Sequence, residues 1–208
     1  MKPDEVYKSM ENCWQNFKGY TYAGKLIINS SEKLTKKMLA EIKLPKDAKI
    51  LDLGCGTGRT IINFKSWGYK NIIGIDNSPA SIQICSNRGL KPGKDVFLMD
   101  GTQSSFQDKT FDLIFEEGVL EHFEDFSPFI KEMSRLSNRY ILLLQPNHYS
   151  LMGKLIDIAE HLCGRNVKEY SYHQKNFVKV LEEKGFSLRK TNYTPLHEIF
   201  ALLFKRKK

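Results

Sequence analysis

The segment at residues 50–60, ILDLGCGTGRT, constrains the fold of this chain more than any other. It has a short apolar run, an acidic residue, and a loop with glycine at positions 54, 56 and 58 that opens into a helix pattern. Glycine adopts positive φ readily, and it lets backbone N–H groups and a helix N-terminus come close to a ligand. The segment therefore predicts a strand, a tight turn and a helix, with a ligand site at the turn.

The rest of the chain alternates between strand and helix patterns. Strands are predicted at 49–53, 71–75, 96–99, 111–115 and 140–144, and helices at 58–67, 78–89 and 127–136. The last two helices start with Ser78-Pro79 and Ser127-Pro128, where serine is expected to cap the helix and proline to fit the first helical position. Such alternation predicts an α/β fold with a mostly parallel sheet.

The flanking segments are less regular. Predicted helices lie at 3–17, from Ser30 or Ser31 to Pro45, and at 149–164, followed by a polar, aromatic segment at 166–173. One more helix, which Gly185 ends, is followed by predicted strands at 186–193 and 198–204. These segments are expected to surround the alternating core.

Composition is that of a soluble globular protein. Of the 208 residues, 41% are hydrophobic and 27% charged, and no apolar run approaches the roughly 20 residues that span a bilayer. Charged residues at the N-terminus argue against a signal peptide, so a cytoplasmic location is expected. The net charge of +8 is scattered, which favours a solvated lysine-rich surface over a nucleic-acid footprint.

The cysteines carry little chemistry in this interpretation. All four lie far apart, with no CxxC pair and no zinc-finger spacing, so free thiols and no metal are expected. Cys55 lies inside the glycine loop, where we favour a small residue tolerated in a crowded place over a nucleophile.

Acidic residues follow three predicted strands at their carboxyl ends. Asp52 begins the glycine loop, Asp76 follows the second strand, and Asp100-Gly101 follows the third. In an open parallel sheet, ligands bind beyond these ends, where the strand order reverses. An acid after the second strand can accept hydrogen bonds from both hydroxyls of a ribose. The pattern predicts a cofactor that contains a nucleoside.

The whole constellation resembles the class I S-adenosylmethionine-dependent methyltransferases. In that family a hydrophobic strand leads into D/E-x-G-x-G-x-G, an acid follows the second strand, and often another follows the third. Residues 111–123, FDLIFEEGVLEHF, are similar to the fourth-strand signature of the ubiquinone/menaquinone-type and related small-molecule methyltransferases. The resemblance covers 46–147 well. It implies a Rossmann-like, doubly wound, mostly parallel seven-stranded sheet with helices on both faces and an antiparallel final strand.

The resemblance also implies a site for S-adenosylmethionine (SAM), with S-adenosylhomocysteine (SAH) as the product. The loop would line the methionine and ribose portions through the backbone of Gly54, Gly56 and Gly58. Asp52 would act near the methionine amino group, directly or through water. Glu117 or its neighbour Glu116 would lie close to the methionine ammonium group.

The adenosine portion would be bound at the next two strand ends. Asp76 would bind the ribose hydroxyls, with Asn77 beside it against the adenine. Asp100 would accept a hydrogen bond from the adenine amino group, and Gly101 would leave room for the ring. In this interpretation the chain is one domain, 1–208, with an N-terminal helical cap (1–45), a cofactor-binding core (46–147), a lid insertion (148–175) and a C-terminal helix and strand pair (176–208).

Methyl transfer needs an acceptor atom held in line behind the sulfonium methyl, and a base only where the acceptor must lose a proton. His122 and His148 are the candidate catalytic bases, because they follow the fourth and fifth strands. A helix-packing role is the alternative for His122. Phe123 and Phe126 are candidate walls of an apolar acceptor pocket, with a place in the core as the alternative.

We therefore expect an enzyme that methylates an O, N or C atom of a small molecule. The alternatives are an RNA or protein methyltransferase, which the positive charge favours, and a non-catalytic SAM-binding subunit. The fifth strand ends Gln145-Pro146-Asn147, unlike the Asn/Asp-Pro-Pro-aromatic signature of many methyltransferases that act on base amino groups. A dehydrogenase is disfavoured, since the GxGxxG fingerprint would need glycine where Arg59 stands.

Overall fold

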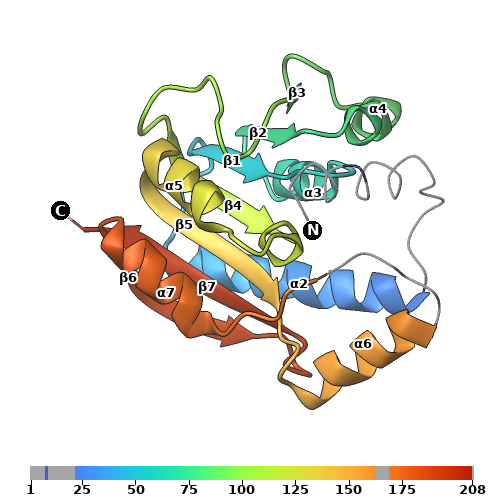
Figure 1. The fold of residues 1–208 in the computed structure, drawn as a ribbon. Helices are drawn as coiled ribbons and strands as arrows, with labels where there is room; N and C mark the ends of the chain where they lie inside the picture. Colours follow the sequence, from blue (N-terminus) through green and yellow to red (C-terminus); the bar gives the residue numbers. More distant parts are fainter. Residues whose placement is uncertain (1–7, 9–21, 163–168, 208) are drawn as a thin grey trace.

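The computed structural model describes residues 8, 22–162 and 169–207 (Figure 1). Within these residues the strands are β1 (Lys49–Leu53), β2 (Asn71–Asp76), β3 (Val96–Leu98), β4 (Phe111–Glu117), β5 (Ser137–Pro146), β6 (Phe186–Tyr193) and β7 (Ile199–Arg206). The helices are α2 (Tyr22–Glu41), α3 (Arg59–Ser66), α4 (Pro79–Asn87), α5 (Ser127–Leu136), α6 (Leu151–Leu162) and α7 (Gln174–Glu183), and a 3-10 turn, η1, spans Leu120–His122.

The strands form one seven-stranded sheet in the order β3-β2-β1-β4-β5-β7-β6. Strands β1 to β5 pair in parallel, and β7 runs antiparallel to both β5 and β6. The order reverses between β1 and β4, where Leu53 lies opposite both Ile75 and Glu116. The predicted Rossmann-like sheet with an antiparallel last strand is therefore confirmed, and the carboxyl ends of β1, β2 and β4 meet at one edge.

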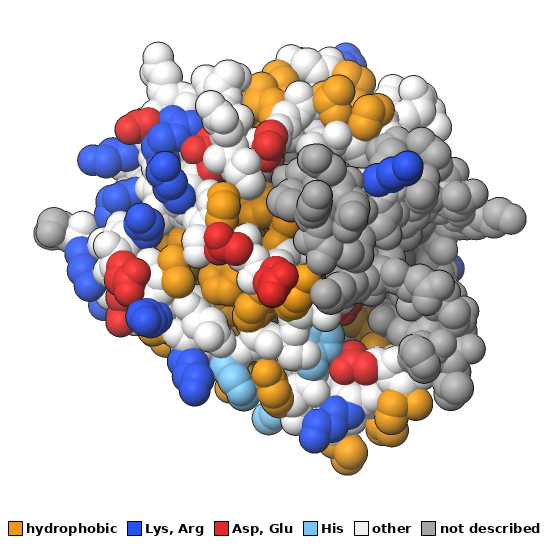
Figure 2. Space-filling model, in the orientation of Figure 1, with side chains coloured by type: hydrophobic (Ala, Val, Ile, Leu, Met, Phe, Trp, Pro, Cys, Tyr) orange, Lys and Arg blue, Asp and Glu red, His pale blue; other side chains and the backbone are white. Residues whose placement is uncertain are grey.

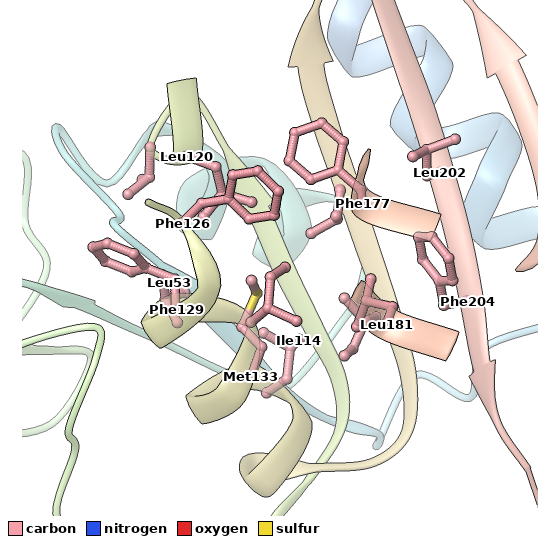
Figure 3. Packing of buried hydrophobic residues seen from close by; sticks show 14 of the residues in the cluster. Leu53, Ile114, Leu120, Phe126, Phe129, Met133, Phe177, Leu181, Leu202 and Phe204 are labelled. Atoms are coloured by element: carbon pink, nitrogen blue, oxygen red, sulfur yellow. The ribbon is translucent and has the colours of Figure 1, made fainter. Parts of the chain in front are cut away.

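Helices cover both faces of the sheet. Helices α5 and α7 pack on one face, and α2, α3 and α4 on the other (Figure 1). Side chains of β4 alternate between the two cores, with Ile114 in the first and Phe115 in the second. Figure 3 shows Phe177 and Leu181 of α7 near Leu202 and Phe204 of β7. Each such buried side chain stabilises the fold by about 1.5–3 kcal/mol.

Two serine-proline starts were predicted, and they differ in detail. The Ser78 hydroxyl accepts a hydrogen bond from the backbone N–H of Ser81 at 3.0 Å, so Ser78 caps α4 as predicted. Ser127 is instead already within α5, and the Asp125 carboxylate accepts the Ser127 N–H at 2.9 Å. The predicted serine cap is therefore wrong for α5, because Phe126 takes the cap position and the described residues make no side-chain capping hydrogen bond there.

The prediction for the second helix was wrong at its start. Helix α2 begins at Tyr22, well before the predicted cap at Ser30 or Ser31. The Ser31 hydroxyl donates to the Ile28 carbonyl at 2.9 Å, so this serine is satisfied inside the helix and caps nothing. Apart from Lys8, the predicted helix at 3–17 lies outside the described residues.

The segment after α6 packs onto the turn after β4. The backbone N–H of Tyr170 donates to the Glu121 carbonyl at 2.6 Å, and the Tyr172 hydroxyl donates to the Phe123 carbonyl at 2.6 Å. Phe123 and Phe126 are buried in the core beneath this segment. Residues 163–168 of the predicted lid lie outside the described residues.

Candidate functional site

The glycine loop after β1 is a tight turn whose amides are used within the protein. Gly54, Gly56 and Gly58 all have positive φ. A Cβ at Gly54 would lie 2.1 Å from Val119 Cγ2, and one at Gly58 would lie 2.3 Å from Leu90 Cδ1. The N–H of Gly54 donates to the Ile75 carbonyl at 2.9 Å. Backbone strain and close packing thus both require glycine at positions 54 and 58, with or without a ligand.

Asp76 ties the end of β2 to this loop. One carboxylate oxygen accepts the Gly56 N–H at 2.8 Å, and the other accepts the Ser78 N–H at 2.9 Å. Asp76 is 9% exposed and carries two oxygens with roughly four acceptor positions between them. It therefore holds the end of β2 against the glycine loop.

Asp52 is a buried acid beneath the loop. It is 3% exposed, and its Oδ2 has no hydrogen-bond partner among the described residues. Burial raises the pKa of Asp52 to about 8, and the nearby charge of Glu117 adds to this rise, while Arg59 opposes it. A buried acceptor of this kind suits a positively charged donor.

Arg59 connects the glycine loop to β4 and to α2. Its guanidinium lies 2.8 Å from Glu117 and 3.3 Å from Glu32. Arg59 is the first residue of α3, directly after Gly58, so its ion pairs fix the loop against the tip of β4. Glu117 is half-buried at that tip, whereas Glu32, which the sequence analysis missed, comes from α2.

Glu116 is fully buried and faces the protein rather than the loop. Its carboxylate accepts the N–H groups of Val119 and Leu120 at 2.9 and 3.3 Å and the amide of Gln145 at 2.7 Å. Burial raises the pKa of Glu116 to about 8 despite these donors. Of the two neighbours, Glu117 is therefore the one paired beside the glycine loop.

Asn77, Asp100 and Gly101 follow the ends of β2 and β3. Asp100 is exposed, and one of its oxygens accepts both the N–H and the hydroxyl of Thr102, at 2.7 and 2.8 Å. A Cβ at Gly101 would lie 3.2 Å from both Leu53 and Phe129, so a larger residue would press on the core. Asn77 is half-buried just before the α4 cap.

The two predicted bases occupy different settings. His122 closes η1 and is half-buried, and its backbone N–H donates to the Val119 carbonyl at 3.1 Å. The His148 ring lies between two acids, with Nδ1 2.9 Å from Asp157 and Nε2 3.7 Å from Glu169. Neither acid was predicted as part of a site, because each stands in a segment whose sequence has no motif.

Glu121 is a further acid that the sequence analysis missed. It is 6% exposed, it stands in η1 directly before His122, and its Oε2 has no hydrogen-bond partner among the described residues. Burial, Glu116 and Glu169 together raise its pKa well above the usual range. The available sequence signal was the Leu120-Glu121-His122 trio, in which only His122 was predicted as a site residue.

The thiols at the loop are free and inert in character. Cys55 and Cys85 are buried free cysteines, and the Cys85 thiol donates to the Gly56 carbonyl at 3.1 Å. The Cys85 side chain and burial raise the pKa of Cys55 well above the usual range, so the nucleophilic thiolate is disfavoured. No group of three or more His, Cys, Asp or Glu side chains in the described part of the chain could hold a metal ion.

Comparison with known proteins finds one matching family model and several relatives. Residues 51–139 match the model of the methyltransferase domain family. The probable (S)-tetrahydroprotoberberine N-methyltransferase 2 of Papaver bracteatum is 30% identical over 145 residues, 63% of this chain and 40% of that protein. EEF1A lysine methyltransferase 2 of Homo sapiens is 35% identical over 92 residues, 43% of this chain and 37% of that protein. The chain thus spans about two fifths of the length of these relatives.

A solved structure shares the fold over nearly its whole length. Magnesium protoporphyrin IX methyltransferase from Synechocystis PCC 6803, solved with bound SAH, superposes with a TM-score of 0.72 at 19% identity. The match covers 98% of this chain and 97% of that one. Residues 51–139 of this chain thus match a methyltransferase domain model, and the chain shares the Rossmann-like fold of this solved methyltransferase.

Proposed function

We propose that this chain is a SAM-dependent methyltransferase that acts on a small-molecule acceptor. The observation that carries the proposal is that the acid-bearing ends of β1, β2 and β4 lie together beside the glycine loop, within residues that match a methyltransferase domain model. Asp52, the loop glycines and Glu117 would hold the methionine portion. Asp76, Asn77, Asp100 and Gly101 would hold the adenosine.

The chemistry of the donor set fits this cofactor. The methionine portion carries an ammonium group, and Asp52 offers a buried oxygen that has no hydrogen-bond donor among the described residues. A buried acceptor without a donor is costly, so a donor supplied by the cofactor would relieve the protein of a penalty of about 1–3 kcal/mol. Asp76 lies at the same loop, where its carboxylate accepts the N–H groups of Gly56 and Ser78, and a ribose hydroxyl is a donor of the kind that a carboxylate accepts.

When bound, SAM supplies a methyl group on a sulfonium, which is already an activated electrophile. The residues of the chain then need only orient the acceptor and, where the acceptor atom carries a proton that must be lost, remove that proton. The Arg59–Glu117 ion pair would keep the loop fixed during this step. His122 and His148 remain the proposed bases, and His148 lies between Asp157 and Glu169, which can orient its ring.

We propose a small-molecule acceptor because of the name of one relative and because of the segments that flank the core in the sequence. The Papaver bracteatum relative is, by its name, an N-methyltransferase of an alkaloid. The segments at 1–45 and 148–175 flank the core, and we propose that they act as cap and lid over the acceptor. We also propose a cytoplasmic location, to which two buried free thiols are suited. None of the described helices is long and apolar enough to cross a membrane.

A protein acceptor is the second candidate, because the human relative is, by its name, a lysine methyltransferase. An RNA acceptor rests on the net charge of +8 alone. A non-catalytic SAM-binding subunit would bind the cofactor without turnover of any acceptor.

Isothermal titration with SAM, SAH and NAD tests the proposal. We expect saturable binding of both sulfur cofactors and none of NAD. Binding of NAD alone would contradict a methyltransferase and would require a dehydrogenase site in the same loop. Release of SAH from SAM in the presence of an acceptor then separates an enzyme from a binding subunit.

A further inference from the structure

A pocket of about 510 Å³ lies between the carboxyl ends of α2 and α3, away from the glycine loop. Three lysines, Lys36, Lys43 and Lys46, line it together with apolar side chains that include Trp67 and Tyr69, and none of the described residues that line it is acidic. Lys46 comes before β1 and the glycine loop after it, so the length of this strand, roughly 17 Å, separates the pocket from the loop. A pocket of this volume suits one small molecule.

The end of α2 supplies two of the lysines. Lys36, Leu39 and Ala40 are spaced by three and four residues, so they share one face of the helix. Just after the helix, Lys43 has a positive φ of 47°, and its N–H donates to the Ala40 carbonyl at 3.2 Å. The N–H of Leu44 donates to the Leu39 carbonyl at 3.4 Å. This hydrogen-bonded turn leaves Lys36 and Lys43 lining the same pocket.

Leucines and aromatic rings form the apolar part of the pocket. Leu39, Leu44 and Tyr69 are buried, and Trp67 is half-buried. The Trp67 ring packs against the core residue Phe64, with the two ring centroids 5.2 Å apart. Because the core holds these side chains in place, the pocket offers a preformed apolar surface to a ligand.

The positive charge of the three lysines is not balanced by acids. None of them forms an ion pair with an acidic side chain of the described residues. Lys36 Nζ lies 4.8 Å from the centroid of the Trp67 ring, and Lys46 Nζ lies 3.9 Å from that of the Tyr69 ring. Lys46 Nζ also donates to the Trp67 carbonyl at 2.8 Å, which uses one of its three N–H donors. The pocket therefore keeps N–H donors and positive charge for an anion.

We propose that this pocket binds a small phosphate ester that carries an aromatic or apolar group. A phosphate ester has a charge of about −1.5 to −2 at neutral pH and three acceptor oxygens, so it can bind more than one ammonium group at once. A carboxylate has a single charge and two oxygens, which suits three lysines less well. The apolar group would lie against Leu39, Leu44 and the Trp67 ring. This second ligand site is separate from the proposed cofactor site and goes beyond the proposed function.

Calorimetric titration with matched naphthalene probes tests the ligand chemistry. The probes are naphthyl phosphate, naphthol, naphthoate and naphthylmethylamine, and inorganic phosphate is titrated alone. We expect naphthyl phosphate to bind roughly tenfold more tightly than each of the others, because only this probe combines the dianionic group with the apolar one. Excess SAH should change its affinity by less than about twofold, because the pocket and the glycine loop lie at opposite ends of β1.

Single lysine variants test the position of the site. Lys36→Gln and Lys43→Gln should each weaken binding of naphthyl phosphate roughly three- to tenfold, since an exposed ammonium group contributes modestly to the binding of an anion. Both side chains are exposed, so the variants should fold as the wild type does. Lys37→Gln is the matched control, because Lys37 is exposed on α2 beside Lys36 and does not line the pocket. It should leave the affinity unchanged.

Three results would overturn the inference. The first is no binding of naphthyl phosphate, or binding no tighter than that of naphthol or naphthoate. The second is an equal loss of affinity in Lys37→Gln and in the two pocket variants, which would show attraction to the positive charge of the whole surface instead of this pocket. The third is competition by SAH, which would place the ester at the glycine loop. None of these results bears on the proposed function, which is tested by the binding of SAM.

Discussion

The glycines of the loop after β1 allow it to pack closely against neighbouring side chains. Gly54 and Gly93 form a matched pair in which the stability cost of close packing can be measured. Gly54 has φ +76° and would place a Cβ 2.1 Å from Val119, whereas Gly93 has φ +74° and nothing within 4 Å. Alanine at either position incurs strain of about 1–2 kcal/mol from the left-handed backbone. Gly54→Ala adds an overlap that costs a further 1–3 kcal/mol or so.

We therefore expect Gly54→Ala to lower the free energy of unfolding more than Gly93→Ala, by about 1–3 kcal/mol. Urea denaturation of the two variants and the wild type measures the difference. Equal losses in the two variants would mean that Val119 moves aside, and that the backbone alone demands glycine at position 54.

Asp76 is the residue on which cofactor affinity should depend most directly. Asp76→Asn keeps the shape of the side chain and removes its charge, so SAH affinity should fall by about 1–3 kcal/mol. Asp47→Asn is the control, because Asp47 is exposed near the opposite end of the sheet, just before β1. Calorimetry on both variants measures the effect, and an Asp76→Asn affinity equal to that of the control would remove Asp76 from the site.

The residue scale also marks the limit of sequence reasoning. Asp52 and Asp76 could be located because a strand pattern and a glycine loop fix their places in the sheet. Glu121 and Glu169 meet only through the packing of the segment after α6 on η1, a contact 49 residues apart for Tyr170 and Glu121. No local pattern encodes such a contact, and only histidines were predicted as bases.

At the scale of elements, the tip of β4 makes stability depend on pH. Burial raises the pKa of Glu116 from 4.5 to about 8, so the folded chain holds a proton that the unfolded chain has released. Stability from this group is complete below pH 4.5 and is lost as pH rises toward about 8. Within that window the free energy of unfolding should fall by up to about 1.4 kcal/mol per pH unit for each such group.

Glu116→Gln tests this element directly, because glutamine fills the same space and binds no proton. We expect urea denaturation of the cofactor-free chain between pH 5.5 and 7.5 to show a shallower fall in stability in Glu116→Gln than in wild type. Asp52 and Glu121 have pKa values raised in the same direction, so part of the slope should remain. Glu182→Gln, an exposed change on α7, is the control; equal slopes in all three proteins would contradict the assignment.

Elements with strong local signals were predicted well. Strands β1 and β6 lie where the patterns put them, and Ser78 caps α4 as expected. The wrong predictions concern polar residues that could either cap a helix or make another hydrogen bond. Ser31 donates a hydrogen bond within α2 instead of starting it, and Ser127 is the first residue of α5, where its N–H donates to Asp125, instead of the cap. The local sequence shows which polar side chains could cap a helix, whereas the folded structure determines which hydrogen bond each of them makes.

At the scale of the whole molecule, surface charge separates the acceptor classes. Lys and Arg side chains gather on the side of α7 and β6, while acids surround the central patch of the face that Figure 2 shows. Binding to RNA through cations would fall steeply as salt rises. We expect weak or absent retention of the chain on RNA at about 150 mM salt. At such a salt concentration, specific complexes with nucleic acid have dissociation constants of about 10 nM or lower.

A filter-binding titration over salt concentration measures this retention. Tight binding to RNA with a steep salt dependence would favour the RNA methyltransferase alternative.

The central claim is that the strand ends around the glycine loop bind SAM. A crystal structure of the chain with SAH tests it most directly, because it reports the ligand and its place together. The account predicts the adenosine beyond the carboxyl ends of β1 to β3, with the ribose at Asp76 and the adenine beside Asp100 and Gly101. Ordered SAH elsewhere on the molecule, with this edge of the sheet left to solvent, would contradict the account.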